Sequence, residues 1–380
     1  MIKKFFVILI CIIFLTGCKQ KDEKYLIFTS WGSKTEVQIL NSLLHEFEIE
    51  NPDIKVKFLH IPQNYFQKLH LMFASNLAPD VIFINNLSIP IYEKYLEDLN
   101  ILFDEEKKEY YNQVLDTMTY ENRLLAIPRD ISELVIFYNK DLFDQYNVNY
   151  PQSDWTIDDL LKSAILLTKK DKCFGISFDE NPMLYLPYLR AFGGGILDKN
   201  NNLIIDNDNS KKGINFYSDL RKKYNVAPKK YQSASKTMAQ MFIDGQLAMH
   251  LSGRWLVPKY REEIKFDWDV INFPDSNGKS SVTIDSSGYA IVKTSKKKQE
   301  AVRLVKFLTS KKASQYFTQT GLIVPARIDT LNSSAFLDGK KPLNSKIFID
   351  IIKSAEKTPV NKNYSEITDN INEKLNYLFN

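Results

Sequence analysis

The sequence predicts an α/β protein of about two domains, and three observations support this fold class. Strand patterns alternate with helix patterns between residues 25 and 84, an order that is typical of a parallel sheet with crossover helices. Of the 380 residues, 44% are hydrophobic and 13% are aromatic, which is enough for a sizeable core. The 50 basic residues nearly balance the 46 acidic ones, and this balance argues against a nucleic-acid partner.

The N-terminus has the pattern of an export signal. Two lysines precede ten apolar residues, Phe5 to Phe14, which are too few to span a bilayer. We therefore predict that residues 1–17 are cleaved. The following Leu-Thr-Gly-Cys resembles the bacterial lipobox, in which the thiol, here of Cys18, carries a diacylglycerol. Residues 18–24 would then form a lipidated tether at the outer side of the cell membrane, although a plain secretory signal with an incidental cysteine is the alternative.

Cysteine and histidine usage predicts neither a disulfide nor a metal site. After cleavage and lipidation only Cys173 remains, and we interpret it as a small core residue. The four histidines are scattered without ligand spacing. We therefore expect no metal and no cofactor.

The first elements follow each other closely. Residues 25–31 form a buried-strand run, and residues 34–51 place apolar side chains on one helical face up to Pro52. A strand with alternating pattern follows at residues 54–61, then a helix at residues 65–75 and an apolar strand at residues 81–84.

Later segments carry more specific signals. Residues 126–139 are too long and too β-branched for a strand within one small sheet, and Pro128 near their start suits an edge or crossover position. Thr156 is predicted to cap a helix, with Asp159 in the capping-box position. Residues 282–293 are predicted to form two strand pieces split by Ser286-Ser287-Gly288.

Eight blocks along the chain together resemble one family. From about Tyr25 to the C-terminus, their order is similar to that in extracellular solute-binding proteins (family 1) of sugar-type ATP-binding-cassette (ABC) importers, the family of maltose-binding protein. The blocks are SWG, LLHEFEIENPDIKV, KLHLMFASNLAPDVIFIN, LLAIPRDISELVIFYNKDLFD, WTIDDLLKSAILLT, FIDGQLAMHLSGRW, SSGYAIVKTSKKKQEAVRLVKFLTS and GLIVPAR.

The resemblance implies a periplasmic-binding-protein-like fold. It has two lobes, each a mostly parallel sheet flanked by helices, and three hinge crossings. We expect the N-terminal lobe at residues 25–131 and 287–329, and the C-terminal lobe at residues 132–286 and 330–380. The crossings would fall within residues 126–139, within residues 282–293 and near Ile328 to Asn332.

In the N-terminal lobe, several candidate ligand-binding residues follow strand ends, where loops of open α/β sheets face the cleft. Trp31 is either a sugar-stacking platform or a core tryptophan. Glu36 either binds ligand or complements the helix dipole. Asp130, with Arg129 as its expected partner, is interpreted as an acceptor for sugar hydroxyls. The remaining candidates, which could equally be structural or solvated loop residues, are Ser30, Tyr65 and Asn85.

In the C-terminal lobe and at the crossings, the strongest candidate is Trp255, because the preceding Gly253 suggests an exposed turn. Gly194, in a triple glycine, either lets a backbone approach the ligand or forms a flexible turn. The other candidates, for which a hinge role is the alternative, are Asp285, Gly288, Tyr289 and Arg327.

These features predict a monomeric binding lipoprotein that delivers a neutral oligosaccharide to the membrane subunits of an ABC permease. Three arginines, Arg129, Arg254 and Arg327, leave a phosphorylated solute such as glycerol phosphate as the alternative. A secreted glycoside hydrolase would need paired carboxylates, and no sequence motif marks such a pair. A sensor that presents its ligand to a receptor kinase would use the same lobes, so the sequence does not separate it from an importer component.

Overall fold

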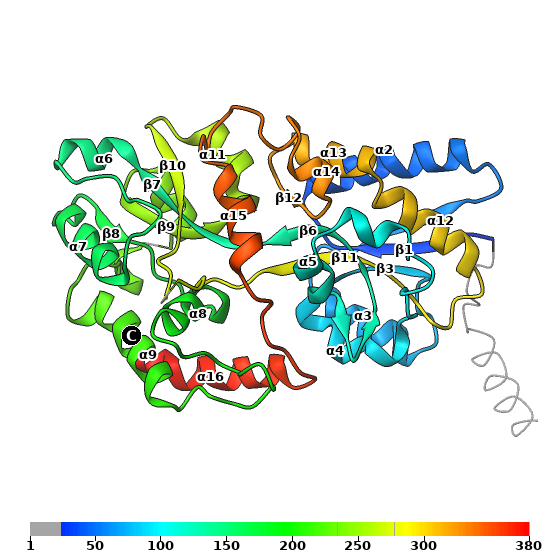
Figure 1. Ribbon diagram of the computed structural model, residues 1–380, viewed down its shortest axis with the longest axis horizontal. Helices are drawn as coiled ribbons and strands as arrows, with labels where there is room; N and C mark the ends of the chain where they lie inside the picture. The colour runs from blue at the N-terminus through cyan, green and yellow to red at the C-terminus, as the bar shows by residue number, and fades with distance from the viewer. Residues whose placement is uncertain (1–23, 234, 277, 380) are drawn as a thin grey trace, which may run out of the picture.

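The computed structural model describes residues 24–233, 235–276 and 278–379. The predicted signal peptide, Cys18 and nearly all of the predicted tether lie outside these residues. The described chain forms two lobes that lie side by side along the long axis (Figure 1).

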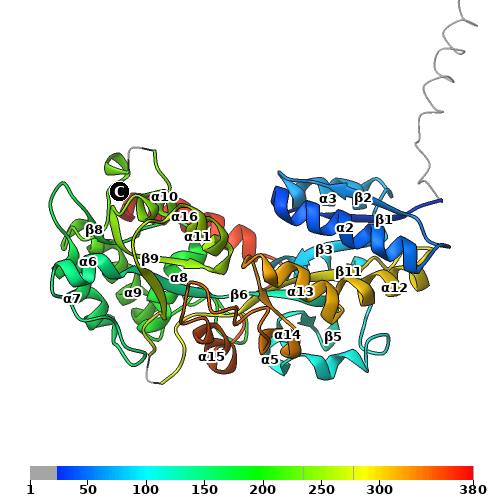
Figure 2. The ribbon, with the colours of Figure 1, turned by 90° about the horizontal axis from the view of Figure 1, so that it is seen from above.

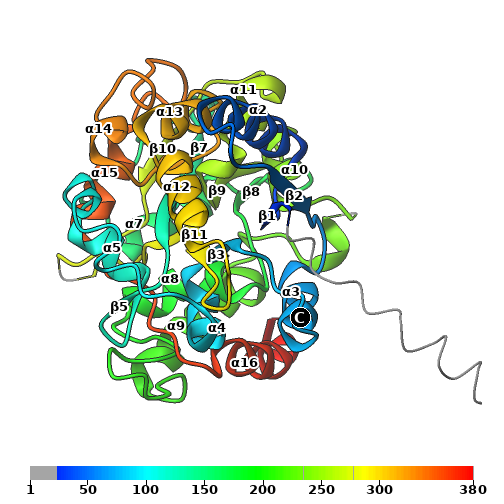
Figure 3. The same ribbon diagram turned by 90° about the vertical axis from the view of Figure 1, so that its right-hand side faces the viewer.

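The first lobe contains a six-stranded sheet with the order β12-β6-β11-β3-β1-β2. Helices α2, α12 and α13 lie on one side of it, and α3, α4 and α5 lie on the other (Figures 1 and 3). The strands are β1 (Leu26–Ser30), β2 (Val56–His60), β3 (Val81–Asn85), β6 (Ile127–Ser132), β11 (Asp285–Ile291) and β12 (Val324–Pro325). The helices are α2 (Lys34–Glu50), α3 (Tyr65–Ala74), α4 (Ile89–Tyr92), α5 (Asn112–Thr117), α12 (Lys298–Leu308), α13 (Lys311–Gln319) and α14 (Ile328–Leu331).

The second lobe contains a four-stranded sheet with the order β10-β7-β9-β8. Its strands are β7 (Leu134–Asn139), β8 (Phe174–Ile176), β9 (Leu247–Gly253) and β10 (Trp268–Asn272). Its helices are α6 (Lys140–Gln145), α7 (Ile157–Leu167), α8 (Pro182–Ala191), α9 (Asp208–Lys222), α10 (Met238–Ile243), α11 (Val257–Glu263) and α16 (Tyr364–Phe379). Helix α15 (Lys346–Ser354) lies between the lobes, and α16 runs along the second lobe (Figures 1 and 2).

Short elements complete the chain. A two-stranded hairpin is formed by β4 (Thr119–Tyr120) and β5 (Arg123–Leu124). The 3-10 helices are η2 (Asn86–Ser88), η3 (Glu93–Tyr95), η4 (Glu106–Glu109), η5 (Lys230–Gln232) and η6 (Arg254–Leu256).

The expectation of mostly parallel sheets is wrong. In the first lobe, β1 pairs in parallel with β2 and β3, whereas β11 pairs antiparallel with β3 and β6, and β12 with β6. In the second lobe only β8 and β9 are parallel. Crossover helices link β1, β2 and β3 and impose the parallel direction, whereas β11 enters the first sheet directly from the other lobe and runs against its neighbours.

Local sequence signals explain helices α2 and α7. Helix α2 buries Leu40, Leu43, Leu44 and Phe47, as the apolar pattern predicts, while Val37 is half-buried. The helix ends before Pro52. The capping box of α7 is also confirmed, because the Thr156 hydroxyl accepts the Asp159 N–H and the Asp159 carboxylate accepts the Thr156 N–H.

The chain passes between the lobes three times. The first passage is at Glu133, between β6 of the first sheet and β7 of the second. The second connects β10 to β11. The third follows α14, because residues 328–331 form a short helix on the first lobe and the chain reaches the second lobe where the Asn344 side chain donates to the Val270 carbonyl.

The second passage differs from its predicted form. Residues 285–291 form one strand, β11, in place of two pieces split by Ser286-Ser287-Gly288. The register against β6 shifts between Ser287 and Gly288. A Cβ at Gly288 would lie 2.2 Å from the Ile127 carbonyl oxygen, so the glycine permits close strand packing and the strand continues through it.

Candidate functional site

A cavity of about 480 Å³ lies where the first two passages meet the second lobe. Its wall combines residues of the first and second passages with residues of α8, η6 and α16. The lining residues are Leu87, Ser132, Glu133, Leu134, Glu180, Asn181, Pro182, Met183, Leu186, Pro187, Trp255, Thr283, Asp285, Thr358, Tyr364, Thr368, Asp369 and Asn372. This size and mixed polarity suit a small-molecule ligand.

Trp255 supplies the large aromatic surface of the cavity. It lies in η6, directly after β9, and 37% of its surface is exposed. Its ring packs over the backbone of Gly253, where an added Cβ would lie 1.9 Å from the ring. Strand β9 therefore ends in a turn that leaves one part of the indole open to the cavity.

Asp285 is the polar residue at which β11 begins. Its Oδ1 accepts a hydrogen bond of 2.7 Å from the Asn86 side-chain amide, and its Oδ2 accepts one of 3.0 Å from the Thr358 hydroxyl. Burial raises the pKa of Asp285, and the two hydrogen bonds partly oppose this rise. The carboxylate thus joins Asn86 of the first lobe to the segment between α15 and α16 at the cavity wall.

Glu133 is a cavity residue that sequence reasoning missed. It is only 2% exposed, and neither of its carboxylate oxygens has a hydrogen-bond partner. Burial raises its pKa well above the ordinary value, the charge of Arg254 lowers it and the charge of Asp130 raises it. The available signal was its position in the long run of residues 126–139, at the point where the strand leaves one sheet for the other.

Trp31 lies in an aromatic cluster of the first lobe. Its ring centroid is 4.4 Å from that of Phe83, 5.0 Å from that of Tyr65 and 5.5 Å from that of Phe66. The Tyr65 hydroxyl donates to the Phe83 carbonyl at 2.8 Å, so it is used within the lobe. Trp31 remains half-buried and is not part of the cavity wall.

Glu36, Arg129 and Asp130 form a buried ionic cluster. The Arg129 Nε donates to Asp130 at 2.5 Å, and its Nη2 donates to Glu36 at 3.1 Å. Glu36 also accepts the Ser33 N–H in the capping box of α2. Burial raises the pKa of Asp130, although Arg129 opposes this rise. Arg129 is thus the partner of Asp130, and the cluster lies outside the cavity wall.

Three further candidates serve close packing in the structure. Gly194 lies after α8, where a Cβ would come 2.5 Å from the Ser210 backbone of α9. Gly288 faces the Ile127 carbonyl, as described above. Tyr289 is fully buried between Phe28 and Phe83, with ring centroids 5.8 and 5.2 Å away.

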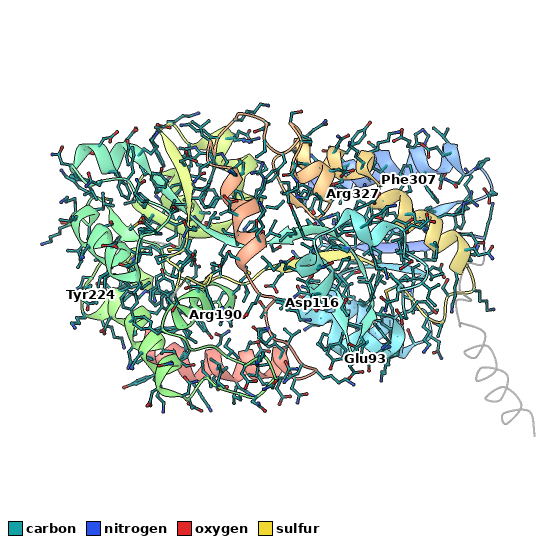
Figure 4. All side chains as sticks on the ribbon, in the orientation of Figure 1. Glu93, Asp116, Arg190, Tyr224, Phe307 and Arg327 are labelled. Atoms are coloured by element: carbon teal, nitrogen blue, oxygen red, sulfur yellow. The ribbon has the colours of Figure 1, made fainter. Side chains whose placement is uncertain are left out.

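The remaining candidates make local contacts. The Ser30 hydroxyl donates to the Trp31 carbonyl, and the Asn85 side chain accepts the Ser88 N–H at 3.0 Å. Arg327 donates to Asp329 at 2.9 Å and pairs with Glu109. Figure 4 shows Arg327 in the first lobe, near α14. Of the twelve ligand-binding candidates, the cavity brings together only Trp255 and Asp285.

Several cavity residues had no signal in the sequence. Asn181 precedes α8, and Tyr364, Asp369 and Asn372 belong to α16. Only the third passage of the chain brings α16 to the cavity, more than a hundred residues after Trp255. Their residue types are common on any helix surface, so nothing local distinguishes them.

The described residues contain no cluster of histidine, cysteine or acidic side chains suited to a metal ion. None of the described helices has the length and apolar character needed to cross a membrane. Cys173 is 4% exposed and donates its thiol to the Leu167 carbonyl, which confirms its role as a small core residue.

The cavity between two α/β lobes defines the class of a solute-binding protein, and the comparisons with known proteins agree. Residues 31–315 match the bacterial extracellular solute-binding protein family, so the chain belongs to this family. The family consists of binding proteins that act outside the cytoplasm.

Similar proteins include both sugar binders and a phosphate-ester binder. The galactooligosaccharide-binding protein of Bacillus subtilis is 22% identical, over 81% of this chain and 74% of its own length. The sn-glycerol-3-phosphate-binding periplasmic protein of Shigella flexneri is 26% identical, over 79% of this chain and 74% of its own length. A substrate-binding protein of Listeria monocytogenes in complex with cycloalternan has a TM-score of 0.84 and 25% identity, and the likeness covers 94% of both chains.

Proposed function

We propose that this protein is the substrate-binding lipoprotein of an ABC importer and that its solute is an oligosaccharide. The observation that carries the proposal is the cavity itself. Trp255 offers a flat apolar face, and the surrounding side chains of Asn181, Asp285 and Asn372 offer hydrogen bonds. An aromatic face with a few convergent polar groups suits the C–H faces and hydroxyls of a sugar.

A phosphorylated solute is the alternative, because one of the similar proteins binds sn-glycerol-3-phosphate. Against it, none of the cavity-lining residues given above is basic. Arg129 is held by Asp130 and Glu36, and Arg327 by Asp329 and Glu109. Arg254 stacks on Phe336, with its guanidinium carbon 4.3 Å from the ring centroid. Phosphate recognition would use such guanidiniums at the ligand itself.

Two lobes joined by three passages can move as rigid bodies about a few hinge residues. The open form would admit the oligosaccharide, and the closed form would bury it and dock on the membrane subunits of the permease. We propose that the protein acts as a monomer, tethered outside the cytoplasm by a lipid on Cys18. It binds its ligand without cleaving it, and no cofactor takes part.

Thermal-shift measurements on the protein lacking residues 1–18 test this proposal, with a panel of oligosaccharides and glycerol phosphate as ligands. We expect an oligosaccharide to raise the melting temperature and to bind one-to-one with micromolar affinity, about −8 kcal/mol. Stabilisation by glycerol phosphate alone would favour the alternative. Chromatography of the sugar after overnight incubation should show it intact, and a cleavage product would indicate a hydrolase.

Transport assays separate an importer from a sensor. A strain that lacks this protein should lose uptake of the stabilising sugar. Retained uptake together with a lost transcriptional response to that sugar would assign the protein to a sensor system.

A further inference from the structure

The cavity wall is strongly acidic. Four carboxylates line it, those of Glu133, Glu180, Asp285 and Asp369, and the lining residues include no lysine, arginine or histidine. A neutral sugar needs hydrogen-bond acceptors, but it does not need an excess of negative charge. The four carboxylates differ in how their charge is compensated.

Glu180 has cationic partners, because Arg221 lies 3.2 Å and Lys230 lies 3.5 Å from its oxygens. Asp285 is hydrogen-bonded, but both of its donors, Asn86 and Thr358, are neutral. Asp369 is exposed on α16 at the cavity wall. Two of these carboxylates, Asp285 and Asp369, therefore have no cationic partner among the described contacts.

Glu133 differs from the other three because it is buried and no other residue donates a hydrogen bond to its oxygens, so its own backbone N–H is the sole donor that lowers its pKa. Buried carboxylates are normally hydrogen-bonded, since an unpaired one costs several kcal/mol of folding free energy. An orphan carboxylate at a ligand cavity indicates that the ligand supplies the missing donors. Glu133 also lies beside the start of β11, because Ser132 pairs with Asp285 in the sheet.

Arg254 is the cation whose charge acts on Glu133, and it does not satisfy the carboxylate. Its guanidinium packs against Phe336 and Phe348, and its Nη1 donates to Ser345 at 3.3 Å. The Nε and Nη2 atoms have no partner, so no hydrogen bond joins Arg254 to Glu133. Asp130, whose charge also acts on Glu133, adds a negative charge near it.

We infer that the bound saccharide carries a protonated amino group, which donates to the Glu133 carboxylate at the cavity wall. An ammonium has three donors and a positive charge, so it matches both the orphan oxygens and the acidic surroundings. Trp255 adds an aromatic surface that attracts cations as well as sugar C–H groups. This inference rests on the proposed function and replaces the expectation of a neutral sugar with an amino sugar.

Matched ligands test the inference on the full chain, purified from membranes in detergent. Two sets are used: glucose, glucosamine and N-acetylglucosamine, and the β-1,4-linked disaccharides of the same three sugars. Within a set only the group at carbon 2 changes, and acetylation removes the charge while it keeps the nitrogen. We expect the amine to bind about tenfold or more tightly than its hydroxyl and acetylated counterparts in at least one set, by titration calorimetry at low salt.

The variant Glu133→Gln cannot ionise and keeps the shape of the side chain. We expect it to lose the preference for the amine, whereas Glu262→Gln, an exposed residue of α11 outside the cavity, should keep it. Thermal melting of each variant verifies folding. Because the wild-type comparison needs no variant, a misfolded Glu133→Gln protein would still leave the ligand test decisive.

Two negative results are distinguishable. If neutral oligosaccharides bind and no amine in either set binds better than its hydroxyl counterpart, the inference is overturned and the proposed function stands. If no carbohydrate of either experiment binds, both fail. An amine preference that persists in a folded Glu133→Gln protein would also overturn the assignment to Glu133.

Discussion

Trp255 can lie on the cavity wall because the nearby Gly253 has no side chain. The ring lies over Gly253 so closely that no Cβ fits between them, which fixes the indole on the turn after β9. A residue without a side chain thus sets the direction of the largest aromatic group in the cavity. Ligand affinity should depend on both residues, although only Trp255 lines the cavity.

The first prediction concerns these two residues. Trp255→Ala should weaken binding of the stabilising sugar by about 1–3 kcal/mol, because an aromatic contact and its buried area are lost. Gly253→Ala should weaken it as well, since the ring must move away. Titration calorimetry measures both. Tyr231→Ala, at an exposed aromatic residue outside the cavity, is the control, and equal losses in all three variants would contradict the role of Trp255.

Glu133 should make the free energy of unfolding depend on pH. Burial raises the pKa of Glu133 in the folded state well above the ordinary value of 4.5. The charge of Arg254 opposes this rise, and the charge of Asp130 adds to it. The unfolded chain therefore releases this proton at lower pH than the folded protein. The contribution of Glu133 to the free energy of unfolding is therefore largest below the ordinary pKa. It decreases as the pH rises from the ordinary pKa toward the pKa of the folded state.

The side chain at position 133 of the Glu133→Gln variant cannot ionise, so the free energy of unfolding of this variant should not decrease in this way as the pH rises. Its free energy of unfolding should match that of the wild type near pH 4 and exceed it at pH 7, by about 1.4 kcal/mol for each unit of raised pKa. Urea denaturation of the ligand-free protein at both pH values measures this difference. A difference that does not change with pH would refute the interpretation.

At the scale of elements, the triple glycine forms a helix contact. Gly193 has φ +77° after the end of α8, and Gly194 then lies against the first turns of α9. The Gly195 N–H donates to the Ser210 hydroxyl at 2.9 Å, which joins this turn to α9. The glycines therefore serve helix packing in this structure, and a ligand role for Gly194 stays a prediction.

Two adjacent substitutions separate these roles. Gly194→Ala places a Cβ 2.5 Å from the Ser210 backbone and should lower the free energy of unfolding by about 1–3 kcal/mol. Gly195→Ala meets its nearest atom, of the Ile204 side chain, at 3.4 Å and should cost much less. Urea denaturation gives both values. A loss of sugar affinity in a stable Gly194→Ala protein would instead support a ligand role.

At the scale of the whole molecule, the proposed function gives the tether and the hinge separate tasks. The predicted lipid on Cys18 would keep the protein near its permease, and the three passages would allow the lobes to close. Since the described lobes begin at residue 24, attachment to the membrane should not affect the cavity. Anchoring and binding should therefore fail independently.

The last prediction tests the anchor. Cys18→Ala should release the protein from the membrane fraction or leave it uncleaved, because the lipobox thiol is missing. Cell fractionation and mass measurement distinguish these forms, and sugar binding by the released protein is the control. A processed, lipid-bearing Cys18→Ala protein that partitions into detergent would refute lipidation at this residue.

The sequence by itself determined the features that depend on near neighbours in the chain. The apolar face of α2, the capping box of α7 and the long run through β6 and β7 follow from periodicity, caps and length. The order of eight blocks along the chain also predicted the family, which the comparison confirmed. The first three signals each lie within a few turns or strands, where local physics acts, whereas the family signal is the order of blocks along the chain.

Only the tertiary structure decided which residues meet. Glu133 and Asp285 come together because β6 and β11 pair across more than 150 residues, and α16 closes the cavity after a third passage. Asp130, Tyr65 and Arg327 were predicted to bind ligand, and the structure shows that their polar groups contact other residues of the first lobe, so their ligand role stays a prediction. A side chain's polarity is visible in the sequence, but whether a partner satisfies it depends on contacts that only folding creates.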